Sequence, residues 1–208
     1  MVGAIAAAIV LLVGGLVFFI TGQPPGPDEA LARLQVTSSP VEVRAFAGSF
    51  RPAGPSEPVL EGTAVRTGEG ALAEIRYFDG SLTRIGPETT YEIVELERAA
   101  NRTEIVGKIG LGETFHDVKE LTGSGSRFEV QESNAIAAVR GTRFAARCLP
   151  PLPCGIAVVE GVVVVTPSSG EPVPVEAGNR ITIDDAGLLG EETAISPDDA
   201  WINQNRDL

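Results

Sequence analysis

The chain offers few kinds of side chain for chemistry: one histidine, two cysteines and 28 acidic residues stand among its 208 residues. His116 and the following Asp117 are two of the three residue types that a Ser-His-Asp catalytic triad requires. Both belong to an apparent strand, however, where neighbouring side chains point to opposite faces. We therefore expect His116 to be a structural residue, on the surface or partly buried. The sequence predicts no catalytic residue and no enzymatic activity.

Metal, cofactor and nucleic-acid sites are also not expected. One histidine cannot build a His-rich site, and two cysteines without C-x-x-C spacing cannot complete a structural zinc site. Gly107, Gly110 and Gly112 lack the Lys-Ser/Thr pair and the helix of a phosphate-binding loop. The formal net charge of -12 opposes binding to phosphate backbones, which requires clustered Lys and Arg.

The two cysteines are close in the chain. Cys148 and Cys154 flank Leu149-Pro-Pro-Leu-Pro153, and three prolines favour a tight turn that can bring the cysteine α-carbons to disulfide distance. We predict a disulfide, which implies an oxidising compartment. The alternative is a loop with two reduced thiols.

A second constellation is Asn134–Phe144, in which small residues precede Arg140-Gly141-Thr142. Alanine and glycine in a strand permit close approach of another backbone layer, and glycine often marks a bulge. We interpret the segment as a tightly packed turn with Arg140 paired to an acidic residue. A contact surface for a partner is the functional alternative.

The elements that must position these residues are short strands. From Val36 onward, apolar and polar residues alternate, as in Ala71–Tyr77 and Thr90–Leu96, and turn signals separate the runs. Asp79-Gly80 is a tight-hairpin signal. The run Val162–Val165 is apolar at every position and predicts a central strand. Ser196-Pro197 predicts the start of a short C-terminal helix, with Ser196 as its cap.

The N-terminal segment differs from the rest. The nineteen residues from Val2 to Ile20 carry no charge, and as a helix they would span roughly 28 Å, near the thickness of a bilayer core. We predict an uncleaved transmembrane helix. The alternative is a cleaved signal peptide, which normally has a shorter apolar region, a preceding positive charge and a small-x-small cleavage site.

These patterns divide the chain into four parts, with residues 22–208 placed outside the cytoplasm on a single-pass membrane protein. They are a transmembrane helix at 1–21, a Pro-rich linker at 22–35, an all-β domain at 36–190, and a tail with a short helix at 191–208.

An ordered set of motifs between Val41 and Ile183 resembles the FecR domain family. The motifs are Val41–Arg44, Glu61–Gly68, Ala73–Pro87, Lys108–Thr114, Ala137–Phe144, Val158–Val164 and Val175–Gly178. The resemblance implies an extracytoplasmic β domain with a β-solenoid-like or β-roll-like architecture. It marks Asp79, Gly80, Ser81, Arg140, Gly141 and Thr142 as structural or partner-contact residues.

The resemblance also implies a role in envelope sensing or transmembrane signal transduction, through a protein or small-ligand partner outside the cytoplasm. The best-known members regulate sigma factors through a cytoplasmic segment that precedes the membrane helix. In this sequence the apolar run starts at Val2, so direct sigma-factor binding is not expected unless translation starts upstream or a separate chain supplies that segment. The alternative function is a stand-alone structural or adhesive envelope protein that binds wall glycan or another surface protein.

Overall fold

The computed structural model describes residues 8–13, 16–21, 30–46 and 48–206. The chain forms two compact units, Met1–Ala30 and Leu31–Leu208, which are described separately. Parts of the predicted membrane segment (1–7 and 14–15), of the linker (22–29) and of the tail (207–208) lie outside the described residues.

Residues 8–13 and 16–21 of the first unit are strands, so the helix predicted over 1–21 is wrong there. Strands β1 (Ala8–Val13) and β2 (Leu16–Thr21) pair antiparallel, with Ala8 opposite Thr21 and Val13 opposite Leu16. Both strands are rich in β-branched and aromatic residues, which favour extended backbone. Among the described residues, no helix has both the length and the apolar character needed to cross a membrane.

The second unit is built from strands and a single described helix, and it begins earlier than predicted, since its first strand lies partly in the expected linker. The bounds are β3 (Ala32–Ser38), β4 (Val41–Ala45), β5 (Arg51–Pro52), β6 (Ser56–Val59), β7 (Thr63–Thr67), β8 (Leu72–Tyr77), β9 (Leu82–Ile85), β10 (Thr90–Ala99), β11 (Arg102–Asp117), β12 (Arg127–Gln131), β13 (Ala135–Val139), β14 (Arg143–Cys148), β15 (Cys154–Glu160), β16 (Val162–Pro167), β17 (Val173–Glu176), β18 (Asn179–Ile183), β19 (Thr193–Ala194) and α1 (Ala200–Asn205).

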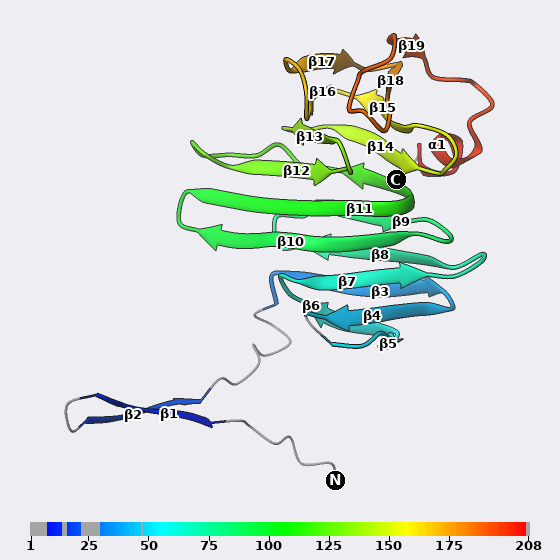
Figure 1. Cartoon of the computed structure of the whole chain (residues 1–208). Coiled ribbons are helices and arrows are strands. Elements are labelled where there is room, and N and C mark those ends of the chain that lie inside the picture. Colours follow the sequence, from blue (N-terminus) through cyan, green and yellow to red (C-terminus); the bar gives the residue numbers. More distant parts are fainter. Residues whose placement is uncertain (1–7, 14–15, 22–29, 47, 207–208) are drawn as a thin grey trace. The chain divides into compact units, whose positions relative to one another are not determined.

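These strands form two ladders that share β11 (Figure 1). The first ladder has the order β6-β3-β8-β9-β11-β14-β15-β18-β19. The second has the order β5-β4-β7-β10-β11-β12-β13-β16-β17. All these pairings are antiparallel except that of β11 with β12.

Strand β11 joins the ladders because it changes partners along its length. Its first half pairs with β10 and β12, and its second half, from Gly112, pairs with β9 and β14. Gly112 has φ of +98°, and a Cβ there would lie 2.1 Å from Oγ1 of Thr89. Only glycine fits so close an approach in that conformation.

The all-β class is confirmed, but the predicted solenoid is wrong, because the strands form open ladders that do not close into a solenoid. Short turns send the chain back beside the preceding strand, which gives antiparallel pairs. The predicted hairpin at Asp79-Gly80 is one example: it joins β8 to β9, with Arg76 opposite Leu82.

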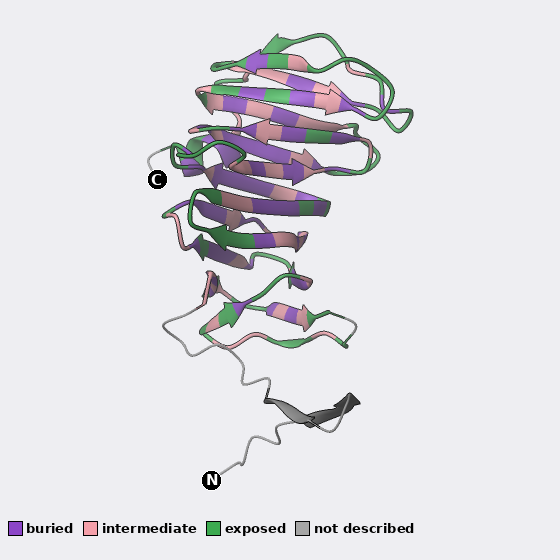
Figure 2. Cartoon of the chain, turned by 90° about the vertical axis from the view of Figure 1, so that its left-hand side faces the viewer, coloured by how far each residue is buried: buried purple, intermediate pink, exposed green. Residues whose placement is uncertain are grey.

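Buried residues alternate with less buried ones along the strands of both ladders (Figure 2). Their apolar side chains form one buried cluster. Strand β16 corrects the prediction of a central strand buried on both faces. It lies between β13 and β17, and it buries Val163 and Val165 but leaves Val162 and Val164 45% and 38% exposed.

The predicted short C-terminal helix is present as α1, and it packs on the first ladder. Trp201 and Ile202 form a second buried cluster with Phe115 and Ala145. The cap of the helix is Asp199 and not the predicted Ser196, since the Asp199 side chain accepts a hydrogen bond from the Ile202 amide.

Candidate functional site

The Asp79-Gly80-Ser81 motif is a self-contained turn that reaches a distant segment. The Asp79 carboxylate accepts hydrogen bonds from the Ser81 amide and hydroxyl, both at 2.9 Å. The Ser81 hydroxyl oxygen in turn accepts a 3.1 Å hydrogen bond from the amide of Lys119. The motif therefore fixes the chain that follows β11.

The Arg140-Gly141-Thr142 motif also binds the chain segment that follows β11. Arg140 Nε donates to the carbonyl of Leu121 at 2.9 Å, so its partner is a backbone carbonyl and not the predicted acidic residue. Thr142 and Val118 exchange two backbone hydrogen bonds of 3.0 and 3.1 Å.

The backbone conformation explains the glycine in this motif. Gly141 has φ of +70°, in the left-handed region that favours glycine, and a Cβ there would make ordinary van der Waals contact with the Glu120 Cα at 3.4 Å. The two predicted motifs thus converge on residues 118–121. Their observed hydrogen bonds hold that segment to the ladders.

A groove of about 550 Å³ adjoins the second motif, and Arg140, Gly141, Val162 and Val164 line it. It continues onto the outer face of the second ladder as an apolar strip, in which Ala138 lies opposite Val164 and Val164 opposite Pro174. We define the apolar strip as Ile136, Ala138, Val162, Val164 and Pro174.

Charged side chains border this groove. Arg127, which lines it, forms ion pairs with Glu95, Glu104 and Glu129. Exposed pairs of this kind contribute little to stability. Together with the apolar strip they give the surface an apolar centre and a polar rim, the composition of a protein interface.

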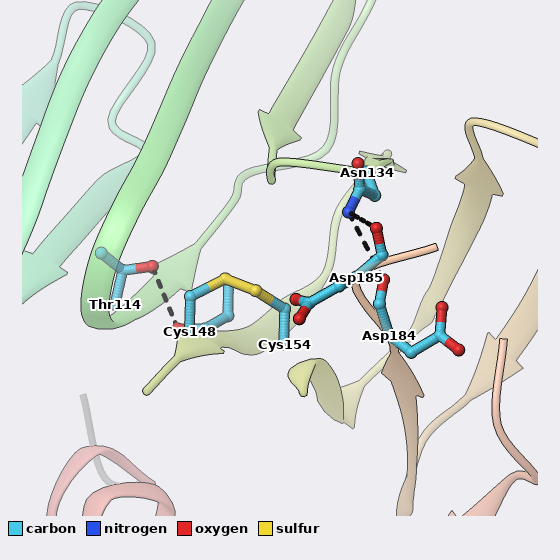
Figure 3. Close-up of a disulfide and its surroundings, with 7 residues drawn as sticks. Thr114, Asn134, Cys148, Cys154, Asp184 and Asp185 are labelled. Atoms are coloured by element: carbon cyan, nitrogen blue, oxygen red, sulfur yellow. Dashed lines mark hydrogen bonds between the residues drawn. A yellow bond between two sulfur atoms is a disulfide. The ribbon is translucent and has the colours of Figure 1, made fainter. Parts of the chain in front are cut away.

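The predicted disulfide is present, and it links β14 to β15 (Figure 3). Cys148 and Cys154 line a cavity of about 120 Å³ together with Asp184 and Asp185. Asn134 holds the chain at these acids, because its side-chain amide donates to the Asp185 carbonyl at 2.9 Å. The disulfide thus borders a cavity that two acidic residues help to line.

The turn closed by the disulfide also borders a larger cavity of about 230 Å³. Leu149, Leu152 and Pro153 line it from the turn, and Arg147 and Asp199 line it from the opposite side. Two nitrogens of the Arg147 guanidinium donate to the Asp199 carboxylate at 3.1 and 3.2 Å, which ties β14 to the cap of α1.

Glu132 is a functional candidate that the sequence reasoning missed. It is 6% exposed, and both of its carboxylate oxygens are buried with no hydrogen-bond partner in the described part of the chain. A carboxylate oxygen of Glu132 and the sulfurs of Cys148 and Cys154 lie within 4.8 Å of one another. Burial raises the pKa of Glu132 to about 8.

A signal for Glu132 exists in the sequence. Phe128 and Val130 are buried, and Glu132 is the next residue of the same parity, so period-two alternation places it on the inner face. Because the two sulfurs are bonded to each other, the group offers no thiolate ligands for a metal.

His116 lies in the interior and not at the surface or half-buried as predicted. Its side chain is fully buried, with Nδ1 3.0 Å from the Thr83 hydroxyl and Nε2 2.8 Å from the Thr114 hydroxyl. The ring stacks on Phe144 at 4.7 Å between centroids. Burial lowers the pKa of His116 to about 3, so the ring is neutral and sealed from substrate.

Known proteins share part of this structure. Residues 63–164 match the family described as FecR protein, which confirms the resemblance. Two crystal structures of a provisionally assigned anti-sigma factor from Parabacteroides distasonis ATCC 8503, at 1.65 and 2.50 Å resolution, match with TM-scores of 0.52 and 16% identity. Each match covers 63% of this chain and 59% of the crystallised chain, less than two thirds of its length. At this identity the likeness shows the fold. No curated protein matches the chain.

Proposed function

Residues 63–164 of this chain belong to the FecR family, and from this premise we propose that the protein is a non-enzymatic regulatory module that binds another protein outside the cytoplasm. The matched crystal structures are of a provisionally assigned anti-sigma factor, which supports a signalling role of this regulator type.

The apolar strip is the observation that carries this proposal. Ile136, Val162 and Val164 are between 37% and 45% exposed on adjacent strands, although nearby inward residues of the same strands are buried. Contiguous apolar surface rimmed by charge marks interaction sites on soluble domains. Aliphatic side chains with a charged rim suit the apolar centre of a protein interface.

The state of His116 supports a non-enzymatic role. A general base must reach the proton that it abstracts, and its pKa must lie near the working pH. His116 is fully buried, and its pKa is lowered to about 3, so it meets neither condition.

We propose a single-pass membrane location with residues 22–208 outside the cytoplasm. The uncharged run from Val2 to Ile20 supports a membrane anchor, and the Cys148–Cys154 disulfide supports an oxidising compartment. Alkaline extraction of membranes tests the anchor: the full chain should stay with the membrane, and a fragment of residues 31–208 should be released. Release of the full chain would contradict it.

Site-specific photo-crosslinking in intact cells tests the partner-binding proposal. A photoreactive residue at position 164 should give a discrete protein adduct, and one at Leu188, which is exposed but lies outside the apolar strip, should not. Val164→Glu should weaken binding to the identified partner at least tenfold, the equivalent of about 1.4 kcal/mol. Leu188→Glu is the matched control.

The free energy of unfolding must be measured alongside binding. For both variants it should lie within about 0.5 kcal/mol of that of the original protein, because both substitutions alter exposed positions. Equal crosslinking at both positions, or full binding by Val164→Glu, would overturn the proposal. Retention on purified wall glycan without a protein adduct would favour the stand-alone envelope protein instead.

A further inference from the structure

Glu132 and the Cys148–Cys154 disulfide lie close together, and the proposed partner binding gives neither of them a role. The carboxyl comes from the end of β12 in the second ladder, and Cys148 and Cys154 come from β14 and β15 in the first. An unpartnered buried carboxyl costs free energy and calls for an explanation. A carboxylate oxygen of Glu132 lies within 4.8 Å of both sulfurs of the disulfide.

We propose that Cys148–Cys154 is a redox-active disulfide, opened by thiol attack on Cys154, and that Glu132 donates the proton that the departing Cys148 sulfur requires. The inference goes beyond the proposed partner-binding function and does not depend on it.

The two cysteine residues differ in exposure, and we infer the direction of attack from this difference. Cys148 is 3% exposed, whereas Cys154 is half-buried and starts β15 at the end of the turn. An incoming thiolate must reach one sulfur in line with the bond to the other. Cys154 is therefore the sulfur attacked, and Cys148 is the leaving group.

The leaving sulfur is generated inside the protein, where a bare thiolate would be costly. Glu132 is 6% exposed in the same interior, so it can carry a transferable proton to this sulfur. The raised pKa of about 8 keeps that proton in place at neutral pH.

The step balances in atoms and electrons. A thiolate RS⁻ forms a bond to the Cys154 sulfur, the sulfur–sulfur bond breaks, and its electron pair goes to Cys148. The Cys148 sulfur takes the proton from Glu132, which leaves a carboxylate. The products are a mixed disulfide at Cys154, a Cys148 thiol and ionised Glu132. The second thiol of the same dithiol reagent, as its thiolate, then attacks the reagent's own sulfur in the mixed disulfide. The reagent closes its own disulfide and is oxidised, and Cys154 leaves as a thiolate that takes a proton from water.

Charged groups around the disulfide select the reagent. Asp184 and Asp185 line the cavity beside the disulfide, and Arg147, Arg180 and Asp199 line the larger cavity on the other side of the turn. The cavity at the sulfurs is thus acidic, and it disfavours anionic thiols such as glutathione. The chemistry fits a neutral dithiol or a dithiol protein with a neutral or basic surface.

Reduction kinetics of the full chain test the proposal, with dithiothreitol as the neutral dithiol and glutathione as the anionic monothiol. At pH 7, Glu132→Gln should slow reduction by dithiothreitol at least tenfold. The matched control is Glu129→Gln, which alters an acidic residue of the other parity in the neighbouring strand β12, and it should leave the rate within twofold. Per thiolate, glutathione should react more slowly than dithiothreitol.

The pH profile separates proton donation from a structural effect. The rate advantage of the original protein over Glu132→Gln should be largest below about pH 8 and should disappear above it, where Glu132 is ionised. A neutral monothiol followed by acid quench and peptide mass mapping should place the adduct on Cys154, with Cys148 free.

Three results would overturn the proposal: equal rates for Glu132→Gln and the original protein, equal slowing by Glu129→Gln, or an adduct on Cys148. If Glu132→Gln fails to fold, Glu132→Asp is the second variant, which should retain the carboxyl proton and part of the rate. Loss of the whole rate advantage at pH 7 in folded Glu132→Asp would also overturn it.

Discussion

His116 and Glu132 are both buried and titratable, but their surroundings differ. The imidazole of His116 has a threonine hydroxyl at each ring nitrogen and an aromatic ring stacked on its face. Both oxygens of Glu132 lack a hydrogen-bond partner in the described residues. A satisfied polar cluster specifies the packing of a core, whereas an unsatisfied buried group is energetically costly and calls for an explanation.

The two groups also make stability depend on pH in opposite directions. The pKa of His116 is lowered to about 3, so its contribution is present above pH 6.5 and is lost as pH falls toward 3. The pKa of Glu132 is raised to about 8, so its contribution is full below pH 4.5 and is lost as pH rises through 8. Both side chains are neutral between about pH 3 and about pH 8.

The largest expected effect is on the acid side. Between pH 6.5 and pH 3 the neutral state of His116 accounts for a loss of up to about 5 kcal/mol in the free energy of unfolding. His116→Gln should remove this part of the pH dependence of the free energy of unfolding, even if the substitution also lowers stability at every pH. Urea unfolding at half-unit pH steps gives the difference curve, and a flat curve would refute the buried, neutral state of His116.

An effect of similar size is expected on the alkaline side. Between pH 4.5 and pH 8, Glu132→Gln should remove a loss of up to about 5 kcal/mol in the free energy of unfolding. Glu129→Gln serves as the control with an unchanged slope. Parallel profiles for Glu132→Gln and the original protein would show that Glu132 is solvated.

The smallest effect concerns the hydroxyl partners of His116. Thr83→Val removes one partner and leaves a buried ring nitrogen unpaired, which should cost about 1–2 kcal/mol at pH 6. Thr83→Ser keeps the hydroxyl and should retain the hydrogen bond. The midpoints of urea unfolding measure both. Equal midpoints for Thr83→Val and the original protein would show that the hydroxyl partner of His116 does not contribute to stability. The contrast between His116 and Glu132 would then be lost.

Local patterns predicted much of the β domain. Alternation gave the all-β class, Asp79-Gly80 gave the hairpin between β8 and β9, and the proline-rich spacing gave the disulfide. Each of these features depends on a few neighbouring residues, so one sequence window contains the necessary information.

Errors occurred where distant parts of the chain decide the outcome. The apolar run Val162–Val165 predicted a strand buried on both faces, but Val162 and Val164 face outward because no described strand or helix covers that face of β16. Ser196 carries a capping signal, yet α1 starts after Asp199, whose carboxylate also binds Arg147 of β14. A tertiary ion pair and the packing of Trp201 select the start of the helix.

The sequence by itself determined the strand periodicity, the turn positions, the cysteine pair and the FecR motifs, because these depend on side-chain type and short-range spacing. Only the tertiary structure decided that the two motifs meet at residues 118–121 and that Glu132 lies beside the disulfide. Those contacts join residues far apart in the chain. Their partners are set by ladder order and register, which a single sequence does not encode locally.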